Sequence, residues 1–372
     1  MKVGIPTEIK NNENRVAATP AGVHELVTRG HEVFVQRGAG LGSRVADEDY
    51  TAAGATLLES ADDVWAEGDL LLKVKEPVKP EFARMREDQV LFTYLHLAAA
   101  RDTADALIRA GGTAIAYETV QLPNRQLPLL SPMSEVAGRL SIQVGGYQLM
   151  SPVGGRGILL GGVPGTPKAR VVVIGGGVAG EHAAANALGM GADVTVIDRD
   201  LSRLRQLEVQ FGGRVQTRAS STYEIAAQLS DADLVIGSVL IPGAAAPKLV
   251  TDVMVASMKP GSVLVDIAID QGGCFEGSHA TTHDDPTFAV HRSLYYCVAN
   301  MPGAVPETAT RALTNATLPY VLAIADKGWT QALRDDAALA KGLNVHAGRV
   351  TNGGVAEALG TSELPIAQAL AA

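Results

Sequence analysis

Cysteine is scarce in this chain of 372 residues, and its scarcity limits the classes of protein to consider. The two cysteines, Cys274 and Cys297, can form at most one disulfide bond, and neither stands in a CxxC or similar metal-ligand spacing. The sequence therefore predicts no metal site. We expect both residues to be reduced thiols of a cytoplasmic protein.

Long apolar runs and an excess of positive charge are also missing from the chain. No uninterrupted apolar run reaches about 18 residues, and the N-terminal stretch MKVGIPTEIKNNENR lacks the apolar core of a signal peptide. The 31 Lys and Arg residues against 40 Asp and Glu residues give a net charge of −9. We therefore expect neither a membrane nor a nucleic acid as a partner, and small-molecule chemistry is the better starting hypothesis.

Short apolar strands alternate with helical stretches in the first third of the chain, which predicts an α/β fold with a doubly wound, mostly parallel sheet. The clearest helix signal is TPAGVHELVTRG, where Thr19 can cap, Pro20 suits the first turn and Gly30 closes the far end. We expect strands at residues 3–5, 32–36, 70–74, 90–94 and 113–117.

A second α/β domain is expected after a helix and a glycine-rich loop. The helical stretch SPMSEVAGRLSIQVGGYQLM leads into the loop SPVGGRGILLGGVPGTPKA, and a strand then precedes GGGVAG. Later strands are expected at residues 233–237, 262–269 and 294–298. From residue 306 we expect the chain to be helical and to rejoin the first domain.

The glycines in VVVIGGGVAG, Gly175, Gly177 and Gly180, are the strongest local signal. They follow a strand and open an Ala-rich helix, where a tight turn, a close backbone approach to a pyrophosphate and helix packing each need a glycine. Asp198 ends the next strand, 23 residues after Gly175, and can accept hydrogen bonds from ribose hydroxyls. The pattern predicts a dinucleotide site and favours NAD over NADP, although the neighbouring Arg199 could accommodate a 2′-phosphate.

Three basic residues follow strands of the first domain: Arg15 after the first strand, Lys75 after LLLKV, and His96 after VLFTYL. Singly, each also fits a structural role, as a surface arginine, a snorkelling lysine or a satisfied histidine. Because the carboxyl ends of parallel strands share one edge, we expect all three to face one crevice. There Arg15 can hold a carboxylate, Lys75 can pair with it or polarise a carbonyl, and His96 can move protons.

The apolar run VLVDIAIDQGG carries two acids, Asp266 and Asp270, which would share one face of a central strand. We expect Asp270 to end that strand at the crevice and to transfer protons beside a nicotinamide, and Asp266 to be structural. The plain alternative is that one or both acids cap a turn or accept backbone hydrogen bonds.

Eight stretches of the chain resemble those of the alanine dehydrogenase and nicotinamide nucleotide transhydrogenase family. They run in the family's order from the first residues to about residue 320: GIPTEIKNNENRVAATP, LLLKVKEP, LHLAA, YETV, SPMSEVAGRL, GGGVAG, VDIAIDQGG and VANMPGAVPETAT. Together they are most similar to alanine dehydrogenases. TEIKNNENRVAATP alone is shared with the NAD-binding subunit of the transhydrogenases.

The resemblance implies NAD-dependent, reversible oxidative deamination of L-alanine to pyruvate and ammonium in a homohexamer. By match to the family's motifs, Arg15 and Lys75 bind the substrate carboxylate, and His96 and Asp270 are the acid and base. It also implies a substrate and catalytic domain of residues 1–128 and 306–372, and a Rossmann NAD-binding domain of residues 129–305.

The cofactor contacts that the resemblance implies lie in the second domain. They are Ser134, Gly175, Gly177, Val178, Ala179, Gly180, Asp198, Arg203, Ser220, Val239, Leu240, Ile267, Ala268, Ile269, Asp270, Val298, Ala299, Asn300 and Met301. After GGCFEGS the family often has Arg, whereas this chain has His279, so a cationic cofactor contact there is open.

Two other functions stay open on the sequence alone. An NAD(H)-binding module of a transhydrogenase would bind the cofactor, deaminate nothing and need a membrane partner. A saccharopine- or lysine-type dehydrogenase of similar fold would act on a larger amino acid and not on alanine. His96 and Asp270 favour the dehydrogenase readings, because only a site that processes a substrate requires them.

Overall fold

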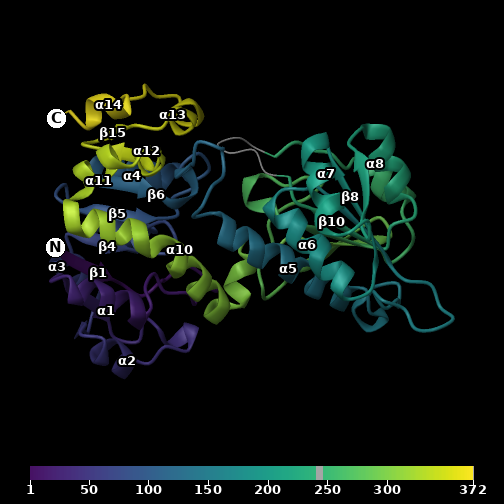
Figure 1. The fold of residues 1–372 in the computed structure, drawn as a ribbon, viewed down its shortest axis with the longest axis horizontal. Helices are drawn as coiled ribbons and strands as arrows, with labels where there is room; N and C mark the ends of the chain where they lie inside the picture. Colours follow the sequence, from purple (N-terminus) through teal and green to yellow (C-terminus); the bar gives the residue numbers. More distant parts are fainter. Residues whose placement is uncertain (240–245, 372) are drawn as a thin grey trace. The chain divides into compact units, whose positions relative to one another are not determined.

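The computed structural model describes residues 1–239 and 246–371, and the chain divides into two units. Unit 1 consists of Met1–Met133 and Val305–Ala372, and unit 2 consists of Ser134–Ala304. Each unit has a central sheet with flanking helices (Figure 1). The chain leaves unit 1 inside helix α5, Ser131–Gln148, whereas the sequence placed the first boundary at residue 129.

The sheet of unit 1 has the strand order β15-β14-β6-β5-β4-β1-β2-β3. All neighbours pair in parallel except at β14, which is antiparallel to both β6 and β15. The chain runs outward from β1 to β3 on one side and from β4 to β6 on the other. The strands are β1 (Lys2–Ile5), β2 (Glu32–Gln36), β3 (Thr56–Leu58), β4 (Leu70–Leu72), β5 (Val90–Thr93), β6 (Thr113–Ala116), β14 (Leu343–His346) and β15 (Arg349–Val350).

The helices of unit 1 cover an apolar sheet whose central strands β4, β5 and β6 are buried along their whole length, as expected for parallel strands covered on both faces. Helix α1 begins as predicted, with Pro20 in its first turn and Thr19 Oγ1 accepting the Gly22 N–H at 3.4 Å. The helices are α1 (Pro20–Thr28), α2 (Asp47–Ala52), α3 (Ala61–Glu67), α4 (Arg101–Ala110), α10 (Pro306–Lys327), α11 (Trp329–Asp335), α12 (Ala337–Ala340), α13 (Gly353–Leu359) and α14 (Ile366–Ala369).

The sheet of unit 2 has the order β12-β13-β11-β10-β7-β8-β9, and only its edge strand β12 is antiparallel. The strands are β7 (Arg170–Ile174), β8 (Asp193–Asp198), β9 (Gln216–Ala219), β10 (Leu234–Gly237), β11 (Val263–Asp266), β12 (Thr287–Val290) and β13 (Ser293–Tyr296). Helices α6 (Val178–Gly189), α7 (Leu201–Gln210), α8 (Thr222–Leu229) and α9 (Asp252–Ser257) connect them. The predicted fold class of two mostly parallel α/β sheets is confirmed.

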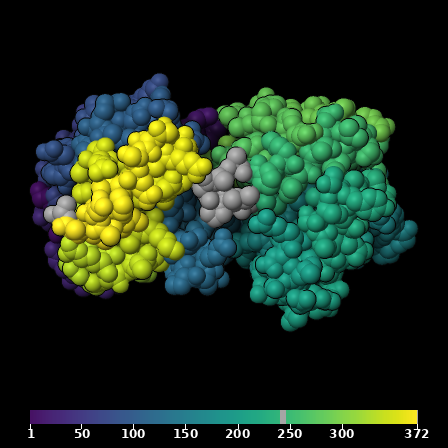
Figure 2. Space-filling model, turned by 90° about the horizontal axis from the view of Figure 1, so that it is seen from above, coloured from purple at the N-terminus to yellow at the C-terminus, as the bar shows by residue number. Residues whose placement is uncertain are grey.

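The C-terminal part rejoins unit 1, but the prediction that it is wholly helical is wrong. Strands β14 and β15 extend the first sheet, and Figure 2 shows the yellow C-terminal residues against the blue residues of the same unit. Leu343 and Val345 are fully buried there, because β14 pairs with β6 and closes what would be an open sheet edge. The sequence of β14, LNVH, alternates apolar and polar residues only twice, which is too short a pattern to predict a strand.

Within the described residues, short 3-10 segments join these elements: η1 (Leu41–Ser43), η2 (Lys79–Arg84), η3 (Tyr117–Thr119), η4 (Ser151–Val153), η5 (Ile269–Gln271) and η6 (Met301–Ala304). Within residues 1–239 and 246–371, no helix combines the length and the apolar character needed to cross a bilayer.

Candidate active site

Arg15, Lys75 and His96 follow the carboxyl ends of β1, β4 and β5, which are adjacent parallel strands of unit 1. The order of the chain reverses between β1 and β4, and the crevice at such a switch point is where open α/β sheets bind ligands. The structure therefore places the three basic residues on the loops of one ligand-binding edge. Their strands end earlier than expected, at Leu72 and Thr93, so Lys75 and His96 stand on the loops themselves.

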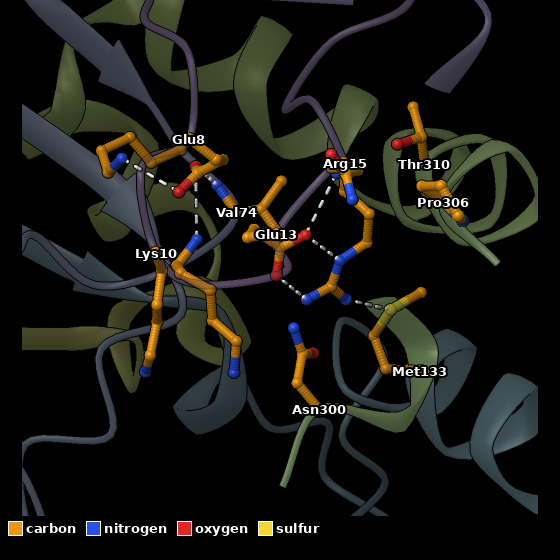
Figure 3. A network of polar contacts seen from close by, with 12 residues as sticks. Glu8, Lys10, Glu13, Arg15, Val74, Met133, Asn300, Pro306 and Thr310 are labelled. Atoms are coloured by element: carbon orange, nitrogen blue, oxygen red, sulfur yellow. Dashed lines mark hydrogen bonds and ion pairs between the residues drawn. The ribbon is translucent and has the colours of Figure 1, made fainter. Parts of the chain in front are cut away.

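Arg15 is held by a buried carboxylate, as Figure 3 shows. Its Nε donates to Glu13 Oε1 at 2.6 Å and its Nη2 to Glu13 Oε2 at 2.5 Å, so the two groups form a fork of parallel hydrogen bonds. Nη1 donates to the Met133 sulfur at 3.0 Å. Burial disfavours the guanidinium charge, but Glu13 outweighs burial and raises the pKa of Arg15. The arginine is thus a permanent cation with a fixed orientation.

Lys75 lies beside a second lysine with a different environment. Lys73 is fully buried and its Nζ donates to Glu8 at 3.0 Å and contacts Glu81 at 2.9 Å. Although burial opposes its charge, these two carboxylates raise the pKa of Lys73. Lys75 is 8% exposed, and its main-chain oxygen accepts from the Thr93 hydroxyl at 3.0 Å. Both charges that face Lys73 thus come from buried carboxylates inside the unit, whereas Lys75 stands on the loop after β4.

His96 has a backbone φ of 48°, in the left-handed region that a non-glycine residue rarely adopts. Glu118, on η3 after β6, accepts the His96 N–H at 2.7 Å and the Leu95 N–H at 3.2 Å. The imidazole stacks on Tyr94 with ring centroids 5.8 Å apart. The carboxylate of Glu118 therefore fixes the turn that carries the histidine.

Glu76 is a further acid among these bases, and it lies next to Lys75 in the chain. Burial alone would raise its pKa, but the charges of Lys75, Lys10 and His96 outweigh burial and lower it. Glu76 Oε1 also accepts a hydrogen bond from Lys10. The loops after β1 and β4 thus carry buried bases and buried acids side by side, Arg15 and Lys75 among Glu8, Glu13 and Glu76.

In unit 2, the three glycines of the loop between β7 and α6 have the three geometries that the motif predicts. Gly175 has a φ of 102°, which only glycine adopts readily. A Cβ at Gly180 would lie 1.8 Å from the Gly175 carbonyl oxygen, so close packing of helix on strand requires glycine there. A Cβ at Gly177 would meet no atom within 4 Å, so this part of the loop faces open space.

The N-terminus of α6 differs from those of the other helices in the unit. Side chains of Asp200, Ser221 and Thr251 cap α7, α8 and α9, whereas Gly177 caps α6 without a side-chain hydrogen bond. The first amides of α6 therefore point at the open space beside Gly177 without a side-chain acceptor. This geometry fits the pyrophosphate of a dinucleotide, which is bound by such amides and by the helix dipole.

Asp198 ends β8 beside the glycine loop. Its Oδ2 accepts the Gly176 N–H at 2.6 Å and its Oδ1 accepts the Asp200 N–H at 2.8 Å. From α7, Arg203 donates through Nε to the Gly176 carbonyl oxygen at 2.6 Å and pairs with Glu181. Two of the predicted cofactor residues, Asp198 and Arg203, thus hold the glycine loop from the side of β8.

The prediction that Asp270 ends a strand and shares a face with Asp266 is wrong. Strand β11 stops at Asp266, and Asp270 lies in the turn η5, where its side chain is exposed. The last hydrogen bond to β10 is donated by the Ile267 N–H to the Gly237 oxygen. The chain turns out of the extended conformation at the next residue, Ala268, whose ψ is 14°. Asp266 is fully buried, and its Oδ2 accepts the Cys274 N–H at 2.8 Å.

The family of the chain follows from comparison with known proteins. Family models described as the alanine dehydrogenase/PNT N-terminal and C-terminal domains match residues 4–137 and 141–353. This chain belongs to the alanine dehydrogenase/PNT family. An alanine dehydrogenase from Mycolicibacterium smegmatis is 62% identical over 100% of both chains, and one from Mycobacterium tuberculosis H37Rv is 63% identical over 97% of each.

Solved structures of the alanine dehydrogenase/PNT type have the same fold. A structure titled L-alanine dehydrogenase matches with a TM-score of 0.93 and 52% identity, and covers 97% of this chain and 99% of its own. A transhydrogenase from Sinorhizobium meliloti matches with a TM-score of 0.80 and 28% identity, over 95% and 99% of the two chains.

The residues predicted as cofactor contacts gather at one edge of the unit 2 sheet. Apart from Arg203 on α7 and Ser134 on α5, the described ones lie on or directly after the carboxyl ends of parallel strands, or at the start of α6: Gly175, Gly177, Val178, Ala179, Gly180, Asp198, Ser220, Val239, Ile267, Ala268, Ile269, Asp270, Val298, Ala299, Asn300 and Met301. Ser134 is one turn before Gly138, where a Cβ would lie 2.2 Å from the Ala179 oxygen. Leu240 lies outside the described residues.

Sequence reasoning missed the acids that orient the bases of unit 1. Glu8, Glu13 and Glu118 each accept backbone N–H groups at or beside a predicted site residue. The signal that could have found them was the position of all three after β1 or β6, on the same edge as the bases. Among the described residues, no group of three or more His, Cys, Asp or Glu could hold a metal ion. His279, the departure from the family pattern, is exposed and stacks on Phe288.

Proposed function

We propose that this chain catalyses the NAD-dependent, reversible oxidative deamination of L-alanine to pyruvate and ammonium. The observation that carries the proposal is the 62% identity to an alanine dehydrogenase over the full length of both chains. The loops of unit 1 support it, because they present an oriented arginine, a lysine and a histidine at one ligand-binding edge.

Arg15 and Lys75 are proposed to hold the substrate carboxylate. The orientation of Arg15 is fixed by Glu13, so little conformational entropy remains to be lost when an anion binds. Lys75 adds a second positive charge, which also suits the developing carbonyl oxygen of pyruvate. Bound NAD would accept the hydride that leaves the α-carbon of alanine, and the substrate then becomes an iminium ion.

His96 and Asp270 are proposed to move the protons of the later steps. Water adds to the iminium carbon and gives up a proton, and the carbinolamine then loses ammonia as its hydroxyl proton is removed. The imidazole of His96 is one proton acceptor, and the exposed carboxylate of Asp270 is a second. Each such transfer is expected to contribute about 10²- to 10⁴-fold in rate.

Unit 2 is proposed to hold NAD. The glycine loop and the N-terminus of α6 would take the pyrophosphate, and Asp198 would accept hydrogen bonds from the ribose hydroxyls. The remaining contacts would come from the edge described above. A carboxylate at this position disfavours the 2′-phosphate of NADP by charge repulsion.

The test is the absorbance of NADH when the purified protein is mixed with NAD and L-alanine at alkaline pH. A rise with L-alanine that is absent with lysine or saccharopine supports the proposal. No rise with any amino acid, while NAD still binds, would instead support the transhydrogenase alternative. The similarity to a transhydrogenase structure at 28% identity is the reason to test that alternative.

We further propose a cytoplasmic homohexamer. Both cysteines are free and buried, in keeping with a reducing compartment. In unit 2, Tyr147 and Met150 at the end of α5 and Leu159 in the loop that follows are about half exposed or more, which is typical of a surface covered in an oligomer. Light scattering after size-exclusion chromatography measures the oligomeric state directly.

A further inference from the structure

Glu8 connects the buried Lys73 to the backbone that carries Lys75. Its Oε2 accepts from Lys73 Nζ at 3.0 Å, and its Oε1 accepts the Val74 N–H at 2.6 Å and the Lys75 N–H at 3.4 Å (Figure 3). The Glu8 side chain is 2% exposed and that of Lys73 is 0% exposed. The carboxylate of Glu8, on the loop after β1, therefore binds the segment that follows β4 through one side-chain and two main-chain hydrogen bonds.

The segment from residue 73 to residue 75 lies beyond the last residue of β4, which is Leu72, so the sheet alone orders it incompletely. Strand β5 still bonds it through the Lys73 N–H to the Phe92 oxygen and through the Thr93 hydroxyl to the Lys75 oxygen. On the other side, next to β1, the N–H groups of Val74 and Lys75 are both directed at Glu8.

We propose that Glu8 is a positioning residue for Lys75, which fixes the backbone from which that lysine reaches the substrate. The inference rests on the proposed function, because it assigns Lys75 to the substrate carboxylate. It also explains the pair of lysines two residues apart. Lys73 supplies the buried partner that pairs with Glu8 Oε2 at 3.0 Å and orients its carboxyl group, and Lys75 supplies the cation proposed to bind the substrate.

Glu81 provides a matched control inside the same ion cluster. It also uses both carboxylate oxygens, one toward Lys73 Nζ at 2.9 Å and the other for a backbone N–H, that of Val78, at 3.0 Å. Its side chain is 3% exposed. Glu8→Gln and Glu81→Gln thus replace one acceptor oxygen by an NH₂ donor in equivalent surroundings, but only Glu8 bonds the backbone of Lys75.

The experiment measures steady-state kinetics of wild type, Glu8→Gln and Glu81→Gln, each well below its melting temperature. For Glu8→Gln we expect the KM for L-alanine to rise and kcat/KM to fall by about tenfold or more, since misplacing a binding group by about 1 Å can cost that much. The KM for NAD should stay the same. Glu81→Gln should lower the melting temperature to a similar extent and change kcat/KM less than about twofold.

Hydrogen exchange supplies a measurement that does not depend on turnover. The amides of Val74 and Lys75 should exchange faster in Glu8→Gln than in wild type, whereas in Glu81→Gln only the amide of Val78 should do so. Should Glu8→Gln fail to fold, Glu8→Asp keeps the charge beside Lys73, yet it is one methylene too short to serve the backbone as well. The same changes are expected for it.

The outcomes separate the two proposals. If wild type does not oxidise alanine, the proposed function fails, and the exchange data still report whether Glu8 orders the segment. If wild type is active and Glu8→Gln matches Glu81→Gln in both kcat/KM and amide exchange at residues 74 and 75, the positioning role of Glu8 is overturned.

Discussion

The backbone at His96 is held in an unfavourable conformation by one carboxylate. A left-handed φ at a non-glycine residue costs about 1–3 kcal/mol, and here Glu118 offsets that cost by accepting the N–H groups of Leu95 and His96. We predict that Glu118→Ala lowers kcat by about tenfold or more, because the turn relaxes and the imidazole moves. The measurement is kcat at saturating alanine and NAD. Glu87→Ala, on the surface of the same unit, serves as control, and an unchanged kcat in Glu118→Ala would contradict the assignment.

Asp200, two residues after Asp198, caps α7 and so provides a control that distinguishes ligand binding from helix capping. We predict that Asp198→Ala raises the KM for NAD by about tenfold or more, since each lost hydrogen bond to a charged group costs about 1.5–3 kcal/mol and about 1.4 kcal/mol corresponds to tenfold. The KM for alanine should stay unchanged. Asp200→Ala removes the cap of α7 and should lower stability by about 1 kcal/mol without the effect on NAD. Equal KM values for NAD in both variants would remove Asp198 from the ribose site.

Asp270 is exposed on η5, so its replacement should leave the fold intact. We predict that Asp270→Asn binds NAD nearly as wild type does and loses about 10²- to 10⁴-fold in kcat, because an amide cannot accept the proton. Calorimetric titration with NAD and single-turnover kinetics measure the two properties. Asp285→Asn, another exposed aspartate of unit 2, is the control. Turnover like that of wild type would exclude Asp270 from the mechanism.

At the scale of elements, the loop from β11 to residue 278 is fastened from two sides. Asp266 accepts the Cys274 N–H from within, while Lys248 Nζ donates to the main-chain oxygens of Gly272 and Phe275 at 2.5 and 2.9 Å. Asp270 is carried by this loop. The loop that carries the predicted proton acceptor is therefore held in part by a buried acid, Asp266.

The ionisation of Asp266 should make stability depend on pH. Burial raises its pKa to about 6 from an ordinary value of 3.8, although hydrogen bonds from the loop and the charge of Lys248 oppose this. Between these pH values the folded chain binds more protons than the unfolded chain, so the free energy of unfolding falls as pH rises, by about 3 kcal/mol in all.

Denaturant unfolding of wild type and Asp266→Asn at pH 4 and pH 7 measures this effect. The stability of wild type relative to Asp266→Asn should be lower at pH 7 than at pH 4, because the amide does not ionise. A constant difference between wild type and Asp266→Asn would show that Asp266 does not titrate in this range.

How far the sequence predicts an element depends on where its information lies. Strands β2 and β10 and the cap of α1 were predictable because their signals are local. Strands β14 and β15 were not predictable, because β14 pairs with β6, which lies more than 200 residues earlier in the chain, and β15 pairs with β14. The end of β11 was missed for a related reason: an Ile-Ala-Ile run looks like a strand, but Ala268 turns out of the extended region.

At the scale of the whole molecule, two sheets and their ligand-binding edges were predictable from alternation, and the bases of the site from their place after strands. The acids were harder to predict: their place after a strand is visible in the sequence, but a glutamate there looks like any surface glutamate until its burial is known. Glu8 and Glu13 are buried as whole residues, and each accepts a backbone N–H, from Val74 and from Arg15. Their function lies in three-dimensional proximity, which spacing along one sequence does not encode.

The interrupted course of unit 1 has a consequence for how the chain is made. Unit 2 is one continuous segment, so it can fold as soon as it leaves the ribosome. Unit 1 must wait, because β14, β15 and the helices from α10 onward follow unit 2 in the chain. Until then the outer side of β6, an apolar strand with the sequence TAIA, is an open sheet edge. The edge of β6 is therefore open to pairing with another chain until β14, residues 343–346, has been synthesised.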